Sequence, residues 1–104
     1  MIGQIDGGKV RREHLRWLLL LAIYNARPTE LVEGVILATA QAMYQDATPI
    51  EIRRELDYLS DRKLVDLRKD PAGPWWTNLT RYGTDIVEYT VDCQPGIARP
   101  AKYW

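Results

Sequence analysis

The sequence contains very few of the residues from which catalytic and metal sites are usually built. Its 104 residues include one cysteine (Cys93), one histidine (His14), one serine (Ser60) and no phenylalanine. A Ser–His or Cys–His pair would have to form from single residues, and one Cys with one His cannot fill a four-ligand zinc site without several acids. No Gly-rich phosphate-binding loop is present. The sequence therefore predicts no enzyme, no metal site and no cofactor.

The chain also has no excess of either charge, no second cysteine and no long apolar run. Fourteen basic and fourteen acidic residues balance, so any contact with nucleic acid must come from a local cluster of cations. A single cysteine excludes an internal disulfide and is typical of a reducing compartment. The longest apolar run, residues 17–24, is too short for a membrane span, and the first residues do not resemble a signal peptide. We expect a cytoplasmic protein without membrane contact.

The composition that remains is typical of one small globular domain. Hydrophobic residues make up 46% and charged residues 27%, and six Tyr and four Trp supply the large aromatic side chains. The Gly7-Gly8 pair at the start and the prolines near the end interrupt regular structure. We therefore expect a flexible arm at residues 1–8, a folded domain at 9–91 and a tail at 92–104.

The first helix is expected at residues 9–26 and is apolar on more than one face. Leu15, Leu19 and Ile23 recur at helical spacing, and Pro28 ends the helix. Four large side chains fall outside that stripe, namely Trp17, Leu20, Leu21 and Tyr24. A helix of this kind is either central to a core or shared with a partner. In so short a chain the pattern favours a homodimer seam through these four residues.

Two more helices are expected before the middle of the chain ends. The second should begin with Thr29 as N-cap, because Glu30 and Glu33 would then lie in its first turn. The third has the clearest start: Thr48-Pro49-Ile50-Glu51 is a capping box with proline at the first helical position. Its residues Ile52, Leu56 and Leu59 share one face, and it should end near Lys63. Arg53 is expected on one flank, and the opposite face should hold Ile50, Arg54, Asp57, Tyr58 and Asp61.

A β-hairpin and a fourth helix should follow. Residues 64–67 predict a strand, residues 70–74 a turn rich in Pro and Gly, and residues 75–79 the returning strand. Thr80 can cap a helix that reaches Tyr89. The predicted fold is mainly α with a β-hairpin, in the order of a winged helix-turn-helix: a three-helix core, a two-stranded wing, a C-terminal helix and an extended tail.

Two segments resemble the winged-helix superfamily of bacterial regulators. Residues 52–65 are similar to a recognition helix that leads into a wing, with Lys63 where glycine is usual, and Leu79-Thr80-Arg81-Tyr82-Gly83 is similar to the segment after the wing. With the tail Pro95-Gly96-Ile97-Ala98-Arg99-Pro100, nearly the whole chain resembles small winged-helix proteins of Mu-like phages and prophages, often labelled arsenic-repressor-like. The resemblance implies the fold and a phage origin, while the cysteine count disfavours metal sensing.

Candidate DNA contacts lie on the third helix, on the wing and at the amino-terminal basic cluster. They are Thr48, Ile50, Arg53, Arg54, Tyr58, Arg68, Lys69, Arg81, Lys9, Arg11 and Arg12. Arginine can pair with guanine or phosphate, and wing cations can reach phosphates. The alternative is a solvated helix, because Glu51, Glu55, Asp57 and Asp61 crowd the same helix, while Asp66 and Asp70 can balance the wing.

The tail at residues 92–104 is too apolar to be expected in solvent. Pro95 and Pro100 stiffen it, and Ile97, Tyr103 and Trp104 are large apolar groups. We expect it to dock in extended form across the first helix of its own chain or onto a partner subunit, with Arg99 paired to an acid. Tyr103 and Trp104 are accordingly candidates for the dimer interface.

Two functions from different classes remain open at this point. The fold and the basic cluster favour a regulator of phage or prophage transcription that binds double-stranded DNA as a homodimer. The zero net charge and the acidic third helix favour a protein-interaction module in phage morphogenesis or DNA packaging, with a phage protein as its partner.

Overall fold

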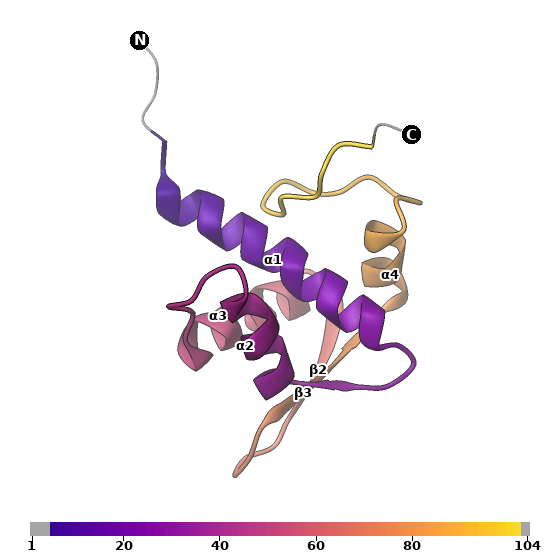
Figure 1. Ribbon diagram of the computed structural model, residues 1–104. Helices are drawn as coiled ribbons and strands as arrows, with labels where there is room; N and C mark the ends of the chain where they lie inside the picture. Colours follow the sequence, from indigo (N-terminus) through magenta and orange to yellow (C-terminus); the bar gives the residue numbers. More distant parts are fainter. Residues whose placement is uncertain (1–4, 103–104) are drawn as a thin grey trace.

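The computed structural model describes residues 5–102, which form a mixed α/β fold (Figure 1). This part of the chain contains four α-helices and one three-stranded antiparallel sheet of strand order β1-β3-β2. In chain order the elements are α1 (Gly7–Ala26), β1 (Leu31–Val32), α2 (Glu33–Gln41), α3 (Pro49–Asp61), β2 (Val65–Lys69), β3 (Trp75–Leu79) and α4 (Arg81–Val87). None of these helices has the length and hydrophobicity required to span a membrane.

Helix α1 begins two residues earlier than its sequence pattern predicts. The Asp6 side chain accepts a hydrogen bond from the Lys9 backbone N–H at 3.1 Å, and Gly7 and Gly8 are already helical. The cap satisfies one of the free N–H groups of the first turn, which offsets the low helix propensity of glycine. The expectation of a flexible arm at 1–8 is therefore wrong for Gly7 and Gly8, while residues 1–4 lie outside the described residues.

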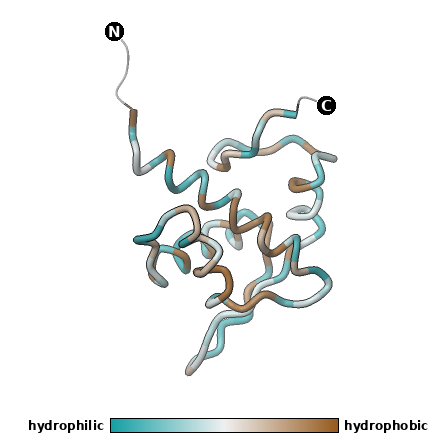
Figure 2. The backbone as a smooth tube through the Cα atoms, viewed as in Figure 1, coloured by the Kyte–Doolittle hydropathy of each residue, from teal (hydrophilic) through white to brown (hydrophobic). Residues whose placement is uncertain are grey.

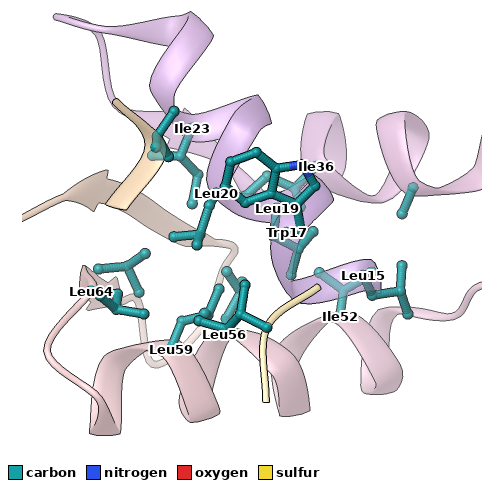
Figure 3. Close-up of a cluster of buried hydrophobic side chains, with 14 of the residues drawn as sticks. Leu15, Trp17, Leu19, Leu20, Ile23, Ile36, Ile52, Leu56, Leu59 and Leu64 are labelled. Carbon is teal, nitrogen blue, oxygen red and sulfur yellow. The ribbon is translucent and has the colours of Figure 1, made fainter. Parts of the chain in front are cut away.

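The hydrophobic core is built around α1 (Figure 3). Leu15, Leu19 and Ile23 are buried as predicted, and α1 packs against α2, α3, β3 and α4. The other large members of the core come from several elements: Ile36, Ile52, Leu56, Leu59, Leu64 and Ile86. Figure 2 shows hydrophobic residues gathered along α1, whereas the projecting hairpin is mostly hydrophilic or neutral.

The expected dimer seam on α1 is wrong for Trp17 and Leu20. Trp17 is 7% exposed and Leu20 is fully buried, both within their own chain. Trp17 makes an edge contact with Tyr89 just after α4, at 6.2 Å between ring centroids. Leu21 and Tyr24 are half-buried against the same core. The apolar second face of α1 exists because α4 and the tail cover it, and the two remaining seam candidates, Tyr103 and Trp104, lie outside the described residues.

The segment after α1 differs from the prediction. Thr29 does not cap a helix; instead Leu31 and Val32 form a short edge strand, and α2 begins only at Glu33. Leu31 pairs with Thr77 of β3, whose hydroxyl donates to the Leu31 carbonyl at 2.9 Å. The partner of this strand lies more than forty residues away, so local pattern alone could not reveal it.

Helix α3 and the hairpin follow the prediction closely. The Thr48 side chain accepts from the Glu51 N–H at 3.2 Å with Pro49 in the first turn, and α3 ends at Asp61, two residues before the predicted end. Lys63 has a φ of 67°, the left-handed conformation for which glycine is the usual choice. Strands β2 and β3 pair from Val65–Leu79 to Lys69–Trp75, which confirms the hairpin.

Helix α4 depends on a close approach of two backbones at Gly83. Thr80 caps the helix by accepting from the Gly83 N–H at 3.0 Å, and α4 ends at Val87, two residues before the expected end. A Cβ atom on Gly83 would lie 2.1 Å from the Leu64 carbonyl oxygen. Glycine is therefore required here because the backbone of the segment that leads into β2 lies against it, and not because α4 crosses another helix.

The tail crosses α1 of its own chain, which confirms the first of the two docking alternatives. The Ala98 N–H donates to the Glu13 carbonyl at 3.1 Å, the Arg16 guanidinium donates to the Gly96 carbonyl at 2.8 Å, and Ile97 is buried. Among residues 5–102 Arg99 has no acidic partner. It donates to the backbone carbonyls of Ile86 and Val91 at 3.0 and 2.9 Å, because the end of α4 leaves carbonyl groups without helical partners.

Substitution of Gly83 by alanine should destabilise the fold by about 3 kcal/mol, the upper end of what overpacking costs. The new methyl group would meet a backbone carbonyl that cannot move without displacing the start of β2. Gly34→Ala is the matched control, since nothing lies within 4 Å of its Cβ position, and it should stabilise by up to about 1 kcal/mol. Urea denaturation of both variants measures the two effects, and equal stabilities would contradict this packing.

Truncation after Asp92 should lower the melting temperature by about 5–10 °C, because it exposes the surface that Ile97 covers and removes the hydrogen bonds from Ala98 and Arg99. Truncation after Lys102 keeps those contacts and serves as the control. Thermal unfolding followed by circular dichroism checks the result, and an unchanged midpoint would show that the tail does not contribute to the fold.

Candidate nucleic-acid interface

The outward face of α3 presents one apolar and one cationic side chain. Ile50 is 72% exposed, and Arg54, one helical turn later, is exposed and makes no ion pair with any residue in 5–102. The opposite face of α3, with Ile52, Leu56 and Leu59, is buried in the core. Ile50 and Arg54 therefore point away from the domain, as the helical spacing predicted.

Thr48 is the N-cap residue of α3. Its side-chain oxygen is occupied as the cap of the helix, accepting from the Glu51 N–H, whereas its hydroxyl proton is free to be donated to another group. Thr48 and Pro49 are exposed. The positive end of the helix dipole thus faces solvent beside Ile50.

Arg53, expected on the flank of α3, is engaged in the fold. Its guanidinium makes two hydrogen bonds with the Glu33 carboxylate at the start of α2, and it lies over the Trp75 ring at 4.7 Å. Glu33 also accepts from the Trp75 backbone N–H at 3.0 Å. The hydrogen bonds from Arg53 hold the pKa of Glu33 below its usual range. Arg53 therefore connects α2, α3 and β3, and its charge is compensated.

Tyr58 lies one helical turn beyond Arg54 but is half-buried. The guanidinium groups of Arg16 and Arg62 lie 3.5 Å and 4.7 Å from its ring centroid. The tail passes close to its hydroxyl, since a Cβ on Gly96 would lie 2.2 Å from that oxygen. Tyr58 therefore has the helical position that was expected, but its side chain is not exposed beside Arg54, because α1 and the tail cover it.

The two cations of the hairpin are each paired with an acid from another element. Arg68 contacts Glu30, before β1, at 3.0 Å, and Lys69 contacts Asp57 of α3 at 2.7 Å. Arg68 also lies over Trp76, and Lys69 over Trp75. The sequence had offered Asp66 and Asp70 as their balancing acids. Asp70 instead accepts from the Ala72 N–H in the turn.

Arg81 does not lie with the cations of the hairpin. It is 91% exposed at the start of α4 and forms a 3.6 Å ion pair with Asp85. Strand β3 separates it from the turn at residues 70–74, a distance of roughly 17 Å along an extended strand of five residues. Arg81 therefore marks the base of the hairpin.

The amino-terminal basic cluster divides into structural and free cations. Arg11 bonds Glu51 and Asp46, both at 2.8 Å, and stacks on Tyr44, which ties α1 to the turn between α2 and α3. The same hydrogen bonds raise the pKa of Arg11 and lower the pKa of Asp46. Lys9 is exposed and 4.0 Å from Glu13. Arg12 is exposed and makes no ion pair within the described chain.

A shallow apolar cavity of about 170 Å³ lies between the starts of α2 and α3. Its lining residues are Glu33, Gly34, Leu37, Pro49, Ile52 and Arg53. The outward face of α2 beside it carries no charge: Val35, Ala38, Thr39 and Ala42 are exposed there. The sequence did not predict this uncharged surface, because apolar residues on all sides of a short helix usually indicate that the helix is buried.

The residues with reactive side chains are dispersed. His14 shares a 2.7 Å hydrogen bond with Tyr44, and burial raises the pKa of the Cys93 thiol, which favours its unreactive protonated form. Within residues 5–102 no group of three His, Cys, Asp or Glu side chains is placed to hold a metal ion.

Comparison of the chain with models of protein families, with curated proteins and with solved structures gives no match. The structure brings the outward face of α3 close to the hairpin. Lys69 of β2 contacts Asp57, which lies about one helical turn beyond Arg54. Arg81 lies elsewhere, at the start of α4, and Arg11 lies beside the start of α3 but is compensated there by Glu51.

The pH dependence of stability should reveal the ion pair between Glu33 and Arg53. A carboxyl whose pKa is lowered by folding stabilises the fold above its unfolded pKa of about 4.3, and this contribution is lost as the pH falls through the lowered folded value. Glu33→Gln should therefore cost about 1–2 kcal/mol at neutral pH, since Arg53 is partly exposed, and much less near pH 3. Urea denaturation at both pH values measures this. The same difference in unfolding free energy between the variant and the unmodified chain at neutral pH and at pH 3 would contradict the prediction.

Proposed function

We propose that the chain is a winged helix-turn-helix protein that binds double-stranded DNA and regulates phage or prophage transcription. The arrangement that supports this is helix, edge strand, two helices and hairpin, with the edge strand β1 paired to the hairpin in the order β1-β3-β2. In helix-turn-helix proteins the second helix of the pair enters the major groove. Here that helix is α3, and the hairpin is the wing. The phage setting rests on the resemblance of the tail and of residues 52–65.

The observation that carries the proposal is the outward face of α3. Its amino-terminal half offers exposed Ile50 and unpaired Arg54, whereas its carboxyl-terminal half carries Asp57 and Asp61. Only the amino-terminal half suits a polyanion, and the helix dipole acts in the same direction. Arginine pairs with the O6 and N7 atoms of guanine, and an apolar side chain packs on the thymine methyl group. Arg54 and Ile50 are thus the residues that read base edges.

A homodimer would suit such a regulator but requires another surface than the centre of α1. Trp17 and Leu20 are buried in their own chain. The uncharged outward face of α2 is the alternative, because charged residues are depleted at the centres of protein interfaces.

A second candidate function, a protein-interaction module in phage morphogenesis or DNA packaging, is favoured by one specific observation. The apolar cavity between α2 and α3 lies next to an uncharged helix face, and cations around it such as Arg53 are neutralised by acids. An apolar side chain of a partner would fit that cavity. Absence of binding to any duplex at low salt would favour this function over DNA binding.

Arg54→Ala should weaken binding to a selected DNA site by about 1–3 kcal/mol and relax the preference at one base pair. The site is first obtained by selecting duplexes from a random pool with the unmodified chain, and affinities are then measured by fluorescence anisotropy. Arg27→Ala removes the same charge at the far end of α1 and is the control. Equal losses in both variants, or none in a folded Arg54→Ala protein, would remove α3 from the DNA site.

A further inference from the structure

Both cations of the hairpin, Arg68 and Lys69, form ion pairs with exposed carboxylates in the free protein. Arg68 and Glu30 are 59% and 37% exposed, and Lys69 and Asp57 are 50% and 47% exposed. Each of these acids has only that single ion-pair partner among the contacts of residues 5–102. The two pairs therefore lie open to solvent, on the elements that flank the proposed DNA surface.

The nearby pair of Arg53 and Glu33 is built differently. The Glu33 side chain is only 14% exposed, and its carboxylate accepts from Arg53 and from the Trp75 backbone N–H. Breaking it would leave a largely buried carboxylate with only the Trp75 N–H as its partner and would remove the side-chain link between α2 and α3. This pair is part of the framework, whereas the contacts of Glu30 and Asp57 can open without loss of any backbone hydrogen bond.

The cations would remain in place if the acids moved away. The Arg68 guanidinium lies over the Trp76 ring at 5.2 Å, and the Lys69 ammonium lies over the Trp75 ring at 4.3 Å. Cation–π contact restricts both side chains independently of the carboxylates. An exposed ion pair is itself weak, because water screens it, so exchange of a carboxylate for another anion costs little.

We propose that Glu30 and Asp57 occupy, in the free protein, the positions that two DNA phosphates take in the complex. This inference rests on the proposed function. Arg68 and Lys69 are the phosphate-binding cations of the wing, and the two acids compete with DNA for them. The competition lowers affinity for all duplexes alike, because phosphates carry no sequence information.

The test is a gain of affinity on removal of the acids. Glu30→Gln with Asp57→Asn should tighten binding to a random-sequence duplex of about 30 base pairs by about two- to five-fold per acid, measured by anisotropy between about 50 and 200 mM salt. Glu88→Gln is the matched control, since it frees Arg27 from an equally exposed ion pair beside α4 and raises the net charge in the same way. It should change affinity far less.

A second arm separates the specific effect from a general charge effect. In a chain that carries Arg68→Ala and Lys69→Ala, removal of Glu30 and Asp57 should give no more gain per negative charge removed than Glu88→Gln does. A gain that persists there, or one matched by Glu88→Gln alone, would overturn the inference while leaving DNA binding intact. No binding by the unmodified chain at the lowest salt would overturn the proposed function as well. Melting temperatures of all variants establish that each is folded.

Discussion

The burial of α1 on more than one face is the constraint on which the rest of this structure depends. Because Leu15, Leu19 and Ile23 pack towards α2 and α3, those two helices are held as a pair. Because Trp17 is covered as well, α4 and the tail must lie along the same helix. A chain of 104 residues can bury only a small core, and here one long helix contributes to that core on two of its faces.

A set of arginine–carboxylate contacts then fixes how the helices are rotated about their axes. Glu55 of α3 is 1% exposed and bonds Arg16 of α1 at 2.7 Å, while Arg16 also holds the tail through Gly96. A carboxylate buried this deeply requires its partner, because an uncompensated charge in the interior is strongly destabilising. With Arg11 bonded to Glu51 one turn earlier, the amino-terminal half of α3 turns Ile50 and Arg54 outwards. The chemistry of the outward face thus follows from contacts on the inward one.

Ion pairs with carboxylates also determine which cations of this protein are available to bind an anion. Most of its candidate DNA-binding cations are neutralised, but for different reasons: Arg11 and Arg53 join elements of the fold, whereas Arg68 and Lys69 hold exposed acids. A net charge of zero is therefore compatible with a small phosphate-binding surface that opens on contact. It is equally compatible with protein docking at the uncharged α2 face, which is why affinity for DNA is the deciding measurement.

The elements whose causes are local could be predicted from the sequence. The capping box at Thr48, the Pro- and Gly-rich turn at residues 70–74 and the Thr80 cap each act within a few residues, and the structure has α3, the hairpin and α4 where those signals lie. The outward positions of Ile50 and Arg54 follow from helical spacing alone. What depends on distant partners was decided only by the tertiary structure. Strand β1 exists because Thr77 lies beside Leu31, and Trp17 is core because Tyr89 and the tail cover it. Whether a cation is free, structural or held by a competing acid depends on side chains up to forty residues away. No pattern along the chain encodes such pairings, because they arise only after the helices have packed.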